Sequence, residues 1–192
     1  MGPEAFVAKL REASFGEACN FYREGAGAER RRARLCQYLA SRRDASLLLV
    51  GEAPGYRGAR VSGVPFTSER QVSGTGPAEA TATIVHRVLC ELGLTDIVLL
   101  WNVVPAHPHL PGRPNTNRRP SRAEIEAGMQ FVRLLARERR VVPVGRLAGE
   151  ALCIPWIRHP SHGGAVAFRE GLARCASCLL DSSVGGLGSA FL

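Results

Sequence analysis

Lysine is almost absent from this chain of 192 residues, because Lys9 is the only one among its 25 lysine and arginine residues. Arginine therefore carries the positive charge, and the formal net charge is +8 with a pI of about 9.8. Arginine presents a planar fork of donors that suits phosphate groups. The charge favours a polyanionic partner, with nucleic acid first, although genomic base composition also enriches arginine.

Long apolar runs and targeting signals are absent too. No apolar run reaches the roughly 18 residues that a membrane span needs, so we expect no contact with a membrane. Residues 1–19 lack the basic start and apolar core of a secretory signal, and Phe6 breaks the pattern for N-myristoylation. We therefore expect a cytoplasmic protein of bacterial type.

Cysteine is present, but not in a pattern that requires disulfides. The chain has six cysteines, and without an export signal we expect them to stay reduced. Cys175 and Cys178 form a C-x2-C pair, and with His159 and His162 they have a spacing that zinc can use. Thiols that pack or lie in a tail are the alternative. We expect no metal, because His159 has a stronger assignment below.

Strand and helix patterns alternate four times along the chain. This predicts an α/β protein, a three-layer α/β/α sandwich around a central four-stranded, mainly parallel sheet. The predicted strands are 47–51, 97–103, 140–144 and 154–158, and the predicted helices are 7–18, 29–43, 77–92, 121–137, 146–152 and 165–174. We expect one domain over residues 1–192, a loose tail over about 179–192, and a monomer.

Three loops leave the carboxyl ends of predicted strands, which lie at one edge of a parallel sheet, where ligands bind. The chemically active side chains of these loops are Glu52 and Phe66 in the first, Asn102, His107 and His109 in the second, and His159 and Ser161 in the third. A carboxylate, an amide, an imidazole and an aromatic ring at one edge suit a planar heterocycle.

Each of these side chains suits a step in such a site. The heterocycle can stack on Phe66, and the Asn102 carboxamide can pair with the donor and acceptor on a base edge. His159 can stabilise negative charge on a ring oxygen, and Glu52 can orient or deprotonate water. A purely structural role also stays open for each residue. Asn102 can hydrogen bond the loop backbone, and Phe66 can pack in the core. His159 can be a hydrogen-bonded packing residue, and Glu52 can cap a helix.

Five segments resemble the uracil-DNA glycosylase superfamily, in the family's order and at compatible spacing. They are GEAPG at 51–55, GVPFTS at 63–68, WNVVP at 101–105, NRRPSRAEI at 117–125 and HPSHGG at 159–164. GEAPG and His-Pro-Ser are similar to the two motifs of the family-4-like members. The resemblance covers roughly residues 45–172.

The resemblance implies a monofunctional uracil-DNA glycosylase of base excision repair. Such an enzyme flips uracil out of single- or double-stranded DNA and hydrolyses its N-glycosidic bond, releasing free uracil and leaving an abasic site. It implies no metal or other cofactor, and association with the nucleoid during repair. The implied site residues are Glu52 and His159 for catalysis, Gly51, Ala53, Phe66 and Asn102 for uracil, and Pro54, Gly55, Tyr56, Ser161, His162, Gly163 and Arg169 for DNA.

The chain departs from the family pattern at several positions. Ala106 and Gly128 stand where two of the cysteine ligands of the family-4 iron–sulfur cluster would fall, so we expect no cluster. The best-known uracil glycosylases carry a water-activating Asp at the position of Ala53 and a thymine-excluding Tyr at the position of Gly55. Glu52 is then the carboxylate nearest to the position of the attacking water. HPSHGG lacks the usual HPSP, so the residue that wedges into the duplex is open between His162 and Arg169.

Three alternatives remain at this stage. The same fold can act on another deaminated or mismatched base, such as hypoxanthine or thymine, because Gly55 leaves room. A non-catalytic protein that binds uracil-containing DNA fits the same motifs. A nucleotide-binding α/β domain with phosphate on the GEAPG turn is less well supported, because the chain lacks the G-K-[ST] of a P-loop.

Overall fold

The computed structural model describes the backbone of residues 1–184 and the side chains of residues 1–177. Its centre is a parallel sheet of three strands: β1 (Leu47–Gly51), β2 (Val98–Asn102) and β3 (Arg140–Pro143), in the order β2-β1-β3. The strands are short apolar runs, as expected for a sheet that is covered on both faces. All five residues of β1 and of β2 are buried.

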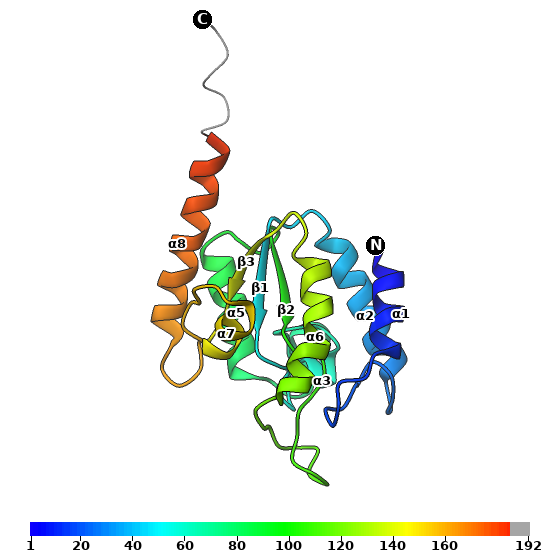
Figure 1. Ribbon diagram of the computed structural model, residues 1–192. Coiled ribbons are helices and arrows are strands. Elements are labelled where there is room, and N and C mark those ends of the chain that lie inside the picture. Colours follow the sequence, from blue (N-terminus) through cyan, green and yellow to red (C-terminus); the bar gives the residue numbers. More distant parts are fainter. Residues whose placement is uncertain (185–192) are drawn as a thin grey trace, which may run out of the picture.

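Helices cover both faces of this sheet (Figure 1). They are α1 (Pro3–Glu12), α2 (Ala28–Ser41), α3 (Ala59–Ser62), α4 (Glu69–Ser73), α5 (Ala80–Glu91), α6 (Arg122–Leu135), α7 (Arg146–Leu152) and α8 (Ala165–Val184). The start of α6 follows the sequence closely, because Ser121 and Glu124 form the predicted capping box. None of the described helices is long and apolar enough to cross a membrane.

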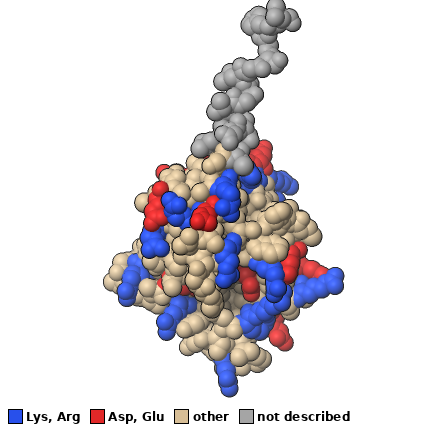
Figure 2. Space-filling model, turned by 90° about the vertical axis from the view of Figure 1, so that its left-hand side faces the viewer, with Lys and Arg blue, Asp and Glu red and all other residues tan. Residues whose placement is uncertain are grey.

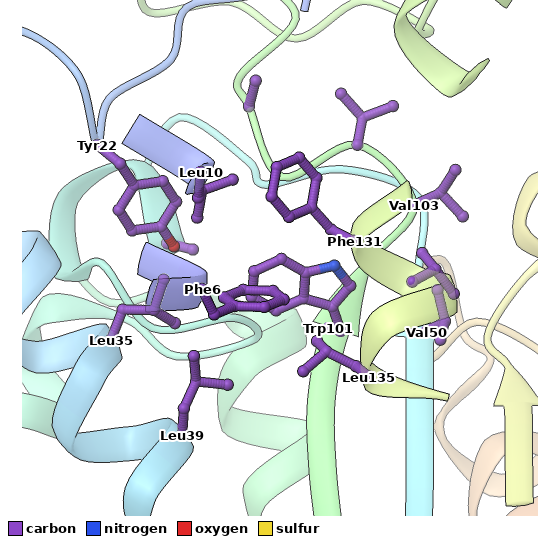
Figure 3. Close-up of a cluster of buried hydrophobic side chains, with 14 of the residues drawn as sticks. Phe6, Leu10, Tyr22, Leu35, Leu39, Val50, Trp101, Val103, Phe131 and Leu135 are labelled. Atoms are coloured by element: carbon purple, nitrogen blue, oxygen red, sulfur yellow. The ribbon is translucent and has the colours of Figure 1, made fainter. Parts of the chain in front are cut away.

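Alternate strand side chains divide the core into two clusters. Leu48, Val50, Leu99 and Trp101 face α1, α2, α6 and α7, whereas Leu47, Leu49 and Leu100 face α5 and α8. In the first cluster the Phe6 ring lies edge-on to Trp101, with 5.3 Å between centroids, and also contacts Phe131 (Figure 3). The three-layer prediction is therefore confirmed.

The predicted fourth strand at 154–158 forms only an isolated parallel bridge between Val144 and Ile157. Ile157 makes two backbone hydrogen bonds, to Pro143 and Gly145, each of 2.9 Å. Pro155 lacks a backbone N–H, and Cys153 just before it adopts a left-handed conformation at the end of α7. The segment therefore reaches the edge of β3 at one point, and the sheet of the described residues has three strands.

Several element boundaries differ from the sequence prediction by one to three residues, and three differences are larger. The first helix lies at Pro3–Glu12 rather than 7–18, and the connection 52–76 contains the short helices α3 and α4. The last helix runs to Val184, so the predicted loose tail is helical up to that residue. The remainder of that predicted tail, 185–192, lies outside the described residues.

The strand order places a topological switch between β1 and β3. The chain passes from β1 through α5 to β2 on one side, and from β2 through α6 to β3 on the other side. Loops that leave neighbouring strands in opposite directions open a crevice at the carboxyl ends of those strands. The loops after Gly51, Asn102 and Pro143 all begin at this edge.

Candidate active site

A cleft of about 760 Å³ lies at this edge of the sheet. Glu52, Asn102 and His159 line it together, so the prediction that three distant loops meet in one cavity is confirmed. Most of the predicted site residues are among its walls: Glu52, Ala53, Pro54, Gly55, Phe66, Asn102, His159, Ser161 and His162.

Gly51 brings the predicted aromatic platform and the predicted amide side by side. It pairs with Asn102 in the register of β1 and β2, and a Cβ on Gly51 would overlap the Phe66 ring and lie 3.0 Å from Asn102 Oδ1. The ring therefore packs directly over the glycine. Phe66 adopts a positive φ of 52°, a strained conformation of the kind that collects at functional sites.

Phe66 packs in the core and also borders the cleft. It is only 9% exposed and belongs to the core cluster against α5 and α8, yet it also lines the cleft. The neighbouring Thr67 hydroxyl lies 3.0 Å from His86 Nε2 on α5, which anchors this loop to the helix. A planar ligand in the cleft would meet a ring that the core already holds in place.

The Asn102 carboxamide makes no side-chain hydrogen bond to a described residue, although Asn102 as a whole is only 4% exposed, and it borders the cleft. Buried amides normally find partners in the folded protein. The structural role considered from the sequence, satisfaction of loop backbone, is therefore not what this side chain does. It is left to hydrogen bond with something that enters the cleft.

His159 is held as a neutral ring with its proton on Nε2. The backbone N–H of Ser161 donates to His159 Nδ1 at 3.2 Å, so Nδ1 must be an acceptor, and the Ser161 hydroxyl lies 2.7 Å from the same atom. Burial, assisted by the charges of Arg158 and His162, lowers the pKa of His159. The ring therefore offers an Nε2–H donor at neutral pH.

Ser161 links two histidines rather than standing alone. Its hydroxyl is also 3.0 Å from His162 Nδ1, so it can donate to His159 and accept from His162. Gly145 carries a φ of +89°, and a Cβ there would lie 3.4 Å from His159 Cβ. The loop after β3 thus packs against the His159 ring from the other side.

Glu52 lies on the turn after β1, which neighbouring loops hold in place. Burial raises the pKa of Glu52, and the positive charge of Arg119 partly opposes this shift. The fully buried His107 faces the Pro54 carbonyl at 2.9 Å and the Pro114 carbonyl at 3.2 Å, and Asn117 accepts from the Tyr56 backbone N–H at 3.1 Å. The long loop after β2 therefore fixes the turn that carries Glu52.

The sequence model of the uracil DNA glycosylase superfamily matches residues 39–177 of this chain. The chain belongs to this superfamily. The enzymes of the superfamily are DNA glycosylases, and the five motifs that pointed to it from the sequence all lie within the matched residues. A comparison with curated proteins gives no match.

The fold agrees with this membership of the uracil-DNA glycosylase superfamily. The crystal structure of wild-type SMUG2 from Pedobacter heparinus is similar to this chain with a TM-score of 0.66 and 14% sequence identity. The similarity covers 94% of this chain and 99% of that protein. At this identity the likeness concerns the fold.

The two positions where family-4 members of the superfamily carry cluster cysteines are closed by packing. Gly128 on α6 lies against the Val103 carbonyl, where any Cβ would overlap, and Ala106 is fully buried in the core. A thiolate and a cluster do not fit there. Among the described residues no group of three or more His, Cys, Asp or Glu could hold a metal ion.

Several residues of this superfamily site were missed from the sequence. Glu79, just before α5, lines the cleft, and burial raises the pKa of its carboxyl. Its carboxylate lies so close to Gly55 and Gly58 that a Cβ at either glycine would overlap it. The long connection after β1 returns Glu79 to the turn at Gly55–Gly58. No local sequence pattern predicts this contact.

The basic wall of the cleft was also missed. Its arginines are Arg118, Arg119, Arg146 and Arg158. Arg118 is tied to the buried Glu124 by two hydrogen bonds, whereas the other three are exposed. A signal existed for Arg146, because it follows directly after the third predicted strand.

Three residues predicted to contact DNA are not among the residues that line the cleft. Tyr56 and Gly163 are chain neighbours of lining residues, and Tyr56 stacks with Arg57 at 5.2 Å. Arg169 lies on α8, where its Nε is 3.5 Å from Glu91 of α5. These assignments stay predictions.

Proposed function

We propose that this protein is a monofunctional DNA glycosylase that removes uracil from DNA by hydrolysis. The observation that carries the proposal is the Asn102 carboxamide, which has no hydrogen-bond partner among the described residues and lies beside the Phe66 ring in a cleft that also holds His159 and Glu52. A flipped uracil would stack on Phe66, donate N3–H to Asn102 Oδ1 and accept at O4 from Nδ2.

The chemistry follows from the remaining two side chains. The N1–C1′ bond stretches toward a sugar cation and a uracil anion, and the Nε2–H of neutral His159 stabilises the charge at O2. Glu52 orients a water whose oxygen bonds to C1′, and it takes the water proton. The uracil anion then takes a proton from the solvent, so the products are free uracil and an abasic site, and no metal or redox cofactor enters these steps.

Water as the nucleophile is supported by the near absence of amines. A bifunctional glycosylase forms a Schiff base between an amine and the sugar, and lysine is the side chain that supplies one. Lys9 is the only lysine, and it lies on α1 away from the residues that line the cleft. Borohydride treatment during turnover is therefore expected to trap no protein–DNA adduct.

The decisive experiment is single-turnover excision on oligonucleotides that each carry one uracil, hypoxanthine or thymine, in single strands and opposite G or A. Alkali then cleaves any abasic product. We expect uracil excision, with a rate about 10²–10³-fold lower for His159→Ala and about 5- to 150-fold lower for Asn102→Ala.

Two matched controls lie outside the cleft lining: His109→Ala and Asn115→Ala remove an imidazole and an amide elsewhere. They are expected to keep the wild-type rate. Excision of another base alone would assign the alternative specificity. Binding without any abasic product would make the protein a binder of uracil-containing DNA.

A further inference from the structure

Trp156 is the one aromatic residue among the exposed large hydrophobic residues of the described chain. It is 48% exposed, whereas the other tryptophan, Trp101, is completely buried. Tryptophan has a large apolar ring with a polar N–H, so an exposed tryptophan is a common contact residue. Neither the superfamily motifs nor the chemistry proposed above uses it.

The backbone places Trp156 beside the cleft. Ile157 pairs with the end of β3 and packs into the core against α8. Trp156 precedes Ile157 and Arg158 follows it, and Arg158 lines the cleft. Trp156 is therefore two residues from a residue of the cleft wall.

Helix α7 fixes the same relation independently. The Trp156 side chain packs on the backbone at Gly149, where a Cβ would lie 2.8 Å from Trp156 Cδ2. Gly149 is three residues, about 4.5 Å of helix, beyond Arg146, which lines the cleft. The indole therefore rests on α7 within one helical turn of the cleft wall, and about half of the residue stays exposed.

The charge around this ring suits a phosphate backbone. Arg119 and Arg146 both lie 3.5 Å from Glu150, so one carboxylate is shared between two guanidinium groups, and Arg158 adds a third. Basic side chains are spread over the whole side of the molecule that carries α8, with a few acidic ones among them (Figure 2). An aromatic ring beside such a row is the arrangement that binds unpaired nucleotides, by stacking and by phosphate contacts.

We propose that Trp156 is a stacking site for an unpaired DNA base next to the nucleotide in the cleft. This inference rests on the proposed function only in that DNA enters the cleft. In a duplex the neighbouring bases are already stacked on one another, so the ring is available chiefly to a single strand. The site therefore adds binding energy for single-stranded DNA.

Fluorescence tests this directly, because Trp156 is the exposed one of two tryptophans. The probe is a short oligodeoxycytidylate, whose base is not a substrate of any activity proposed above. We expect it to quench the emission of the wild-type protein, and the matched duplex to quench it much less. Trp156→Ala should weaken single-strand binding by about 5- to 150-fold.

Two variants serve as controls. Trp156→Phe keeps a ring that stacks, so it should retain more affinity than Trp156→Ala while losing the quenching. Ile97→Ala removes an exposed apolar side chain at the amino end of β2, away from the cleft, and should bind as the wild type does. Circular dichroism of each variant confirms that it has folded.

The outcomes separate this inference from the proposed function. Unquenched wild-type fluorescence at saturating oligodeoxycytidylate, or equal affinity of Trp156→Ala and the wild type, overturns the stacking site. Equal quenching by the duplex overturns the preference for a single strand. Quenching and tight binding without uracil excision would support the stacking site and reject the glycosylase.

Discussion

Glu79 is a carboxyl whose burial costs stability when it is charged. Burial raises its pKa, and no ion pair with a described residue offsets this. A raised native pKa stabilises the fold below the pKa of the unfolded chain, and this contribution is lost as the pH rises through the native pKa. We expect Glu79→Gln to raise the melting temperature at pH 7, and the difference to vanish near pH 4 and below.

Thermal unfolding across this pH range checks the prediction, with Glu126→Gln on the exposed face of α6 as the control. A lower melting temperature of Glu79→Gln at pH 7 would contradict it. That result would mean that the charged carboxylate binds the turn at Gly55–Gly58 favourably.

The positions of single site residues were predictable where the residue lies at or just after the carboxyl end of a strand. Asn102 ends β2, Glu52 follows β1 directly, and His159 follows the segment that bridges to β3, so their positions depend only on parallel strands. Glu79 depends on the path of a long loop, which no period in the sequence encodes. The lack of a hydrogen bond at Asn102 also needs the structure, because a sequence predicts a residue's place but not its partners.

At the scale of elements, the loop after β2 supports the turn after β1 through His107. The ring is fully buried between two carbonyl oxygens, and burial lowers its pKa, so the neutral ring donates to one of them. His107→Ala leaves that carbonyl without its donor and leaves a void where the ring was. We expect it to lower the free energy of unfolding by about 1–3 kcal/mol and to slow excision as the turn loosens.

Urea denaturation measures the first effect and single-turnover excision the second. His109→Ala, two residues along the same loop, is the control, because its ring stacks on His107 with 5.7 Å between centroids but hydrogen bonds the neighbouring Leu110 carbonyl and not the turn after β1. Equal stability of His107→Ala and the control would refute the role of His107 as a link between the two loops.

The elements themselves were predictable to the extent that one local signal sets them. β1, β2 and β3 are short apolar runs, α6 has a capping box, and α7 matches its predicted bounds. The segment 154–158 has the composition of a strand, but pairing depends on donors facing β3, and Pro155 supplies none. The last helix extends beyond its predicted end at 174 because no proline or strong stop signal interrupts it there.

For the whole molecule, the net charge of +8 leaves open whether binding is diffuse or local. The structure gathers the exposed Arg119, Arg146 and Arg158 at one wall of the cleft. Each phosphate contact to a single strand adds about −0.7 to the slope of log K against log salt. Contacts by these three arginines predict a slope of about −2. If the attraction were diffuse, removing any one arginine would change the slope by the same amount, wherever that arginine lies.

Arg158→Ala separates the two cases. If the contacts are local, it makes the slope less negative by about 0.7, measured by fluorescence anisotropy of labelled oligodeoxycytidylate over a salt series. Arg43→Ala removes the same charge at the end of α2, near the amino ends of the strands and opposite the cleft, and should leave the slope unchanged. Equal changes in both variants would show that the overall charge, rather than the cleft wall, holds the DNA. A change of slope in Arg158→Ala alone would mean that the arginines hold the DNA strand at the cleft that Asn102, His159 and Glu52 line. DNA binding and the proposed chemistry would then share one site.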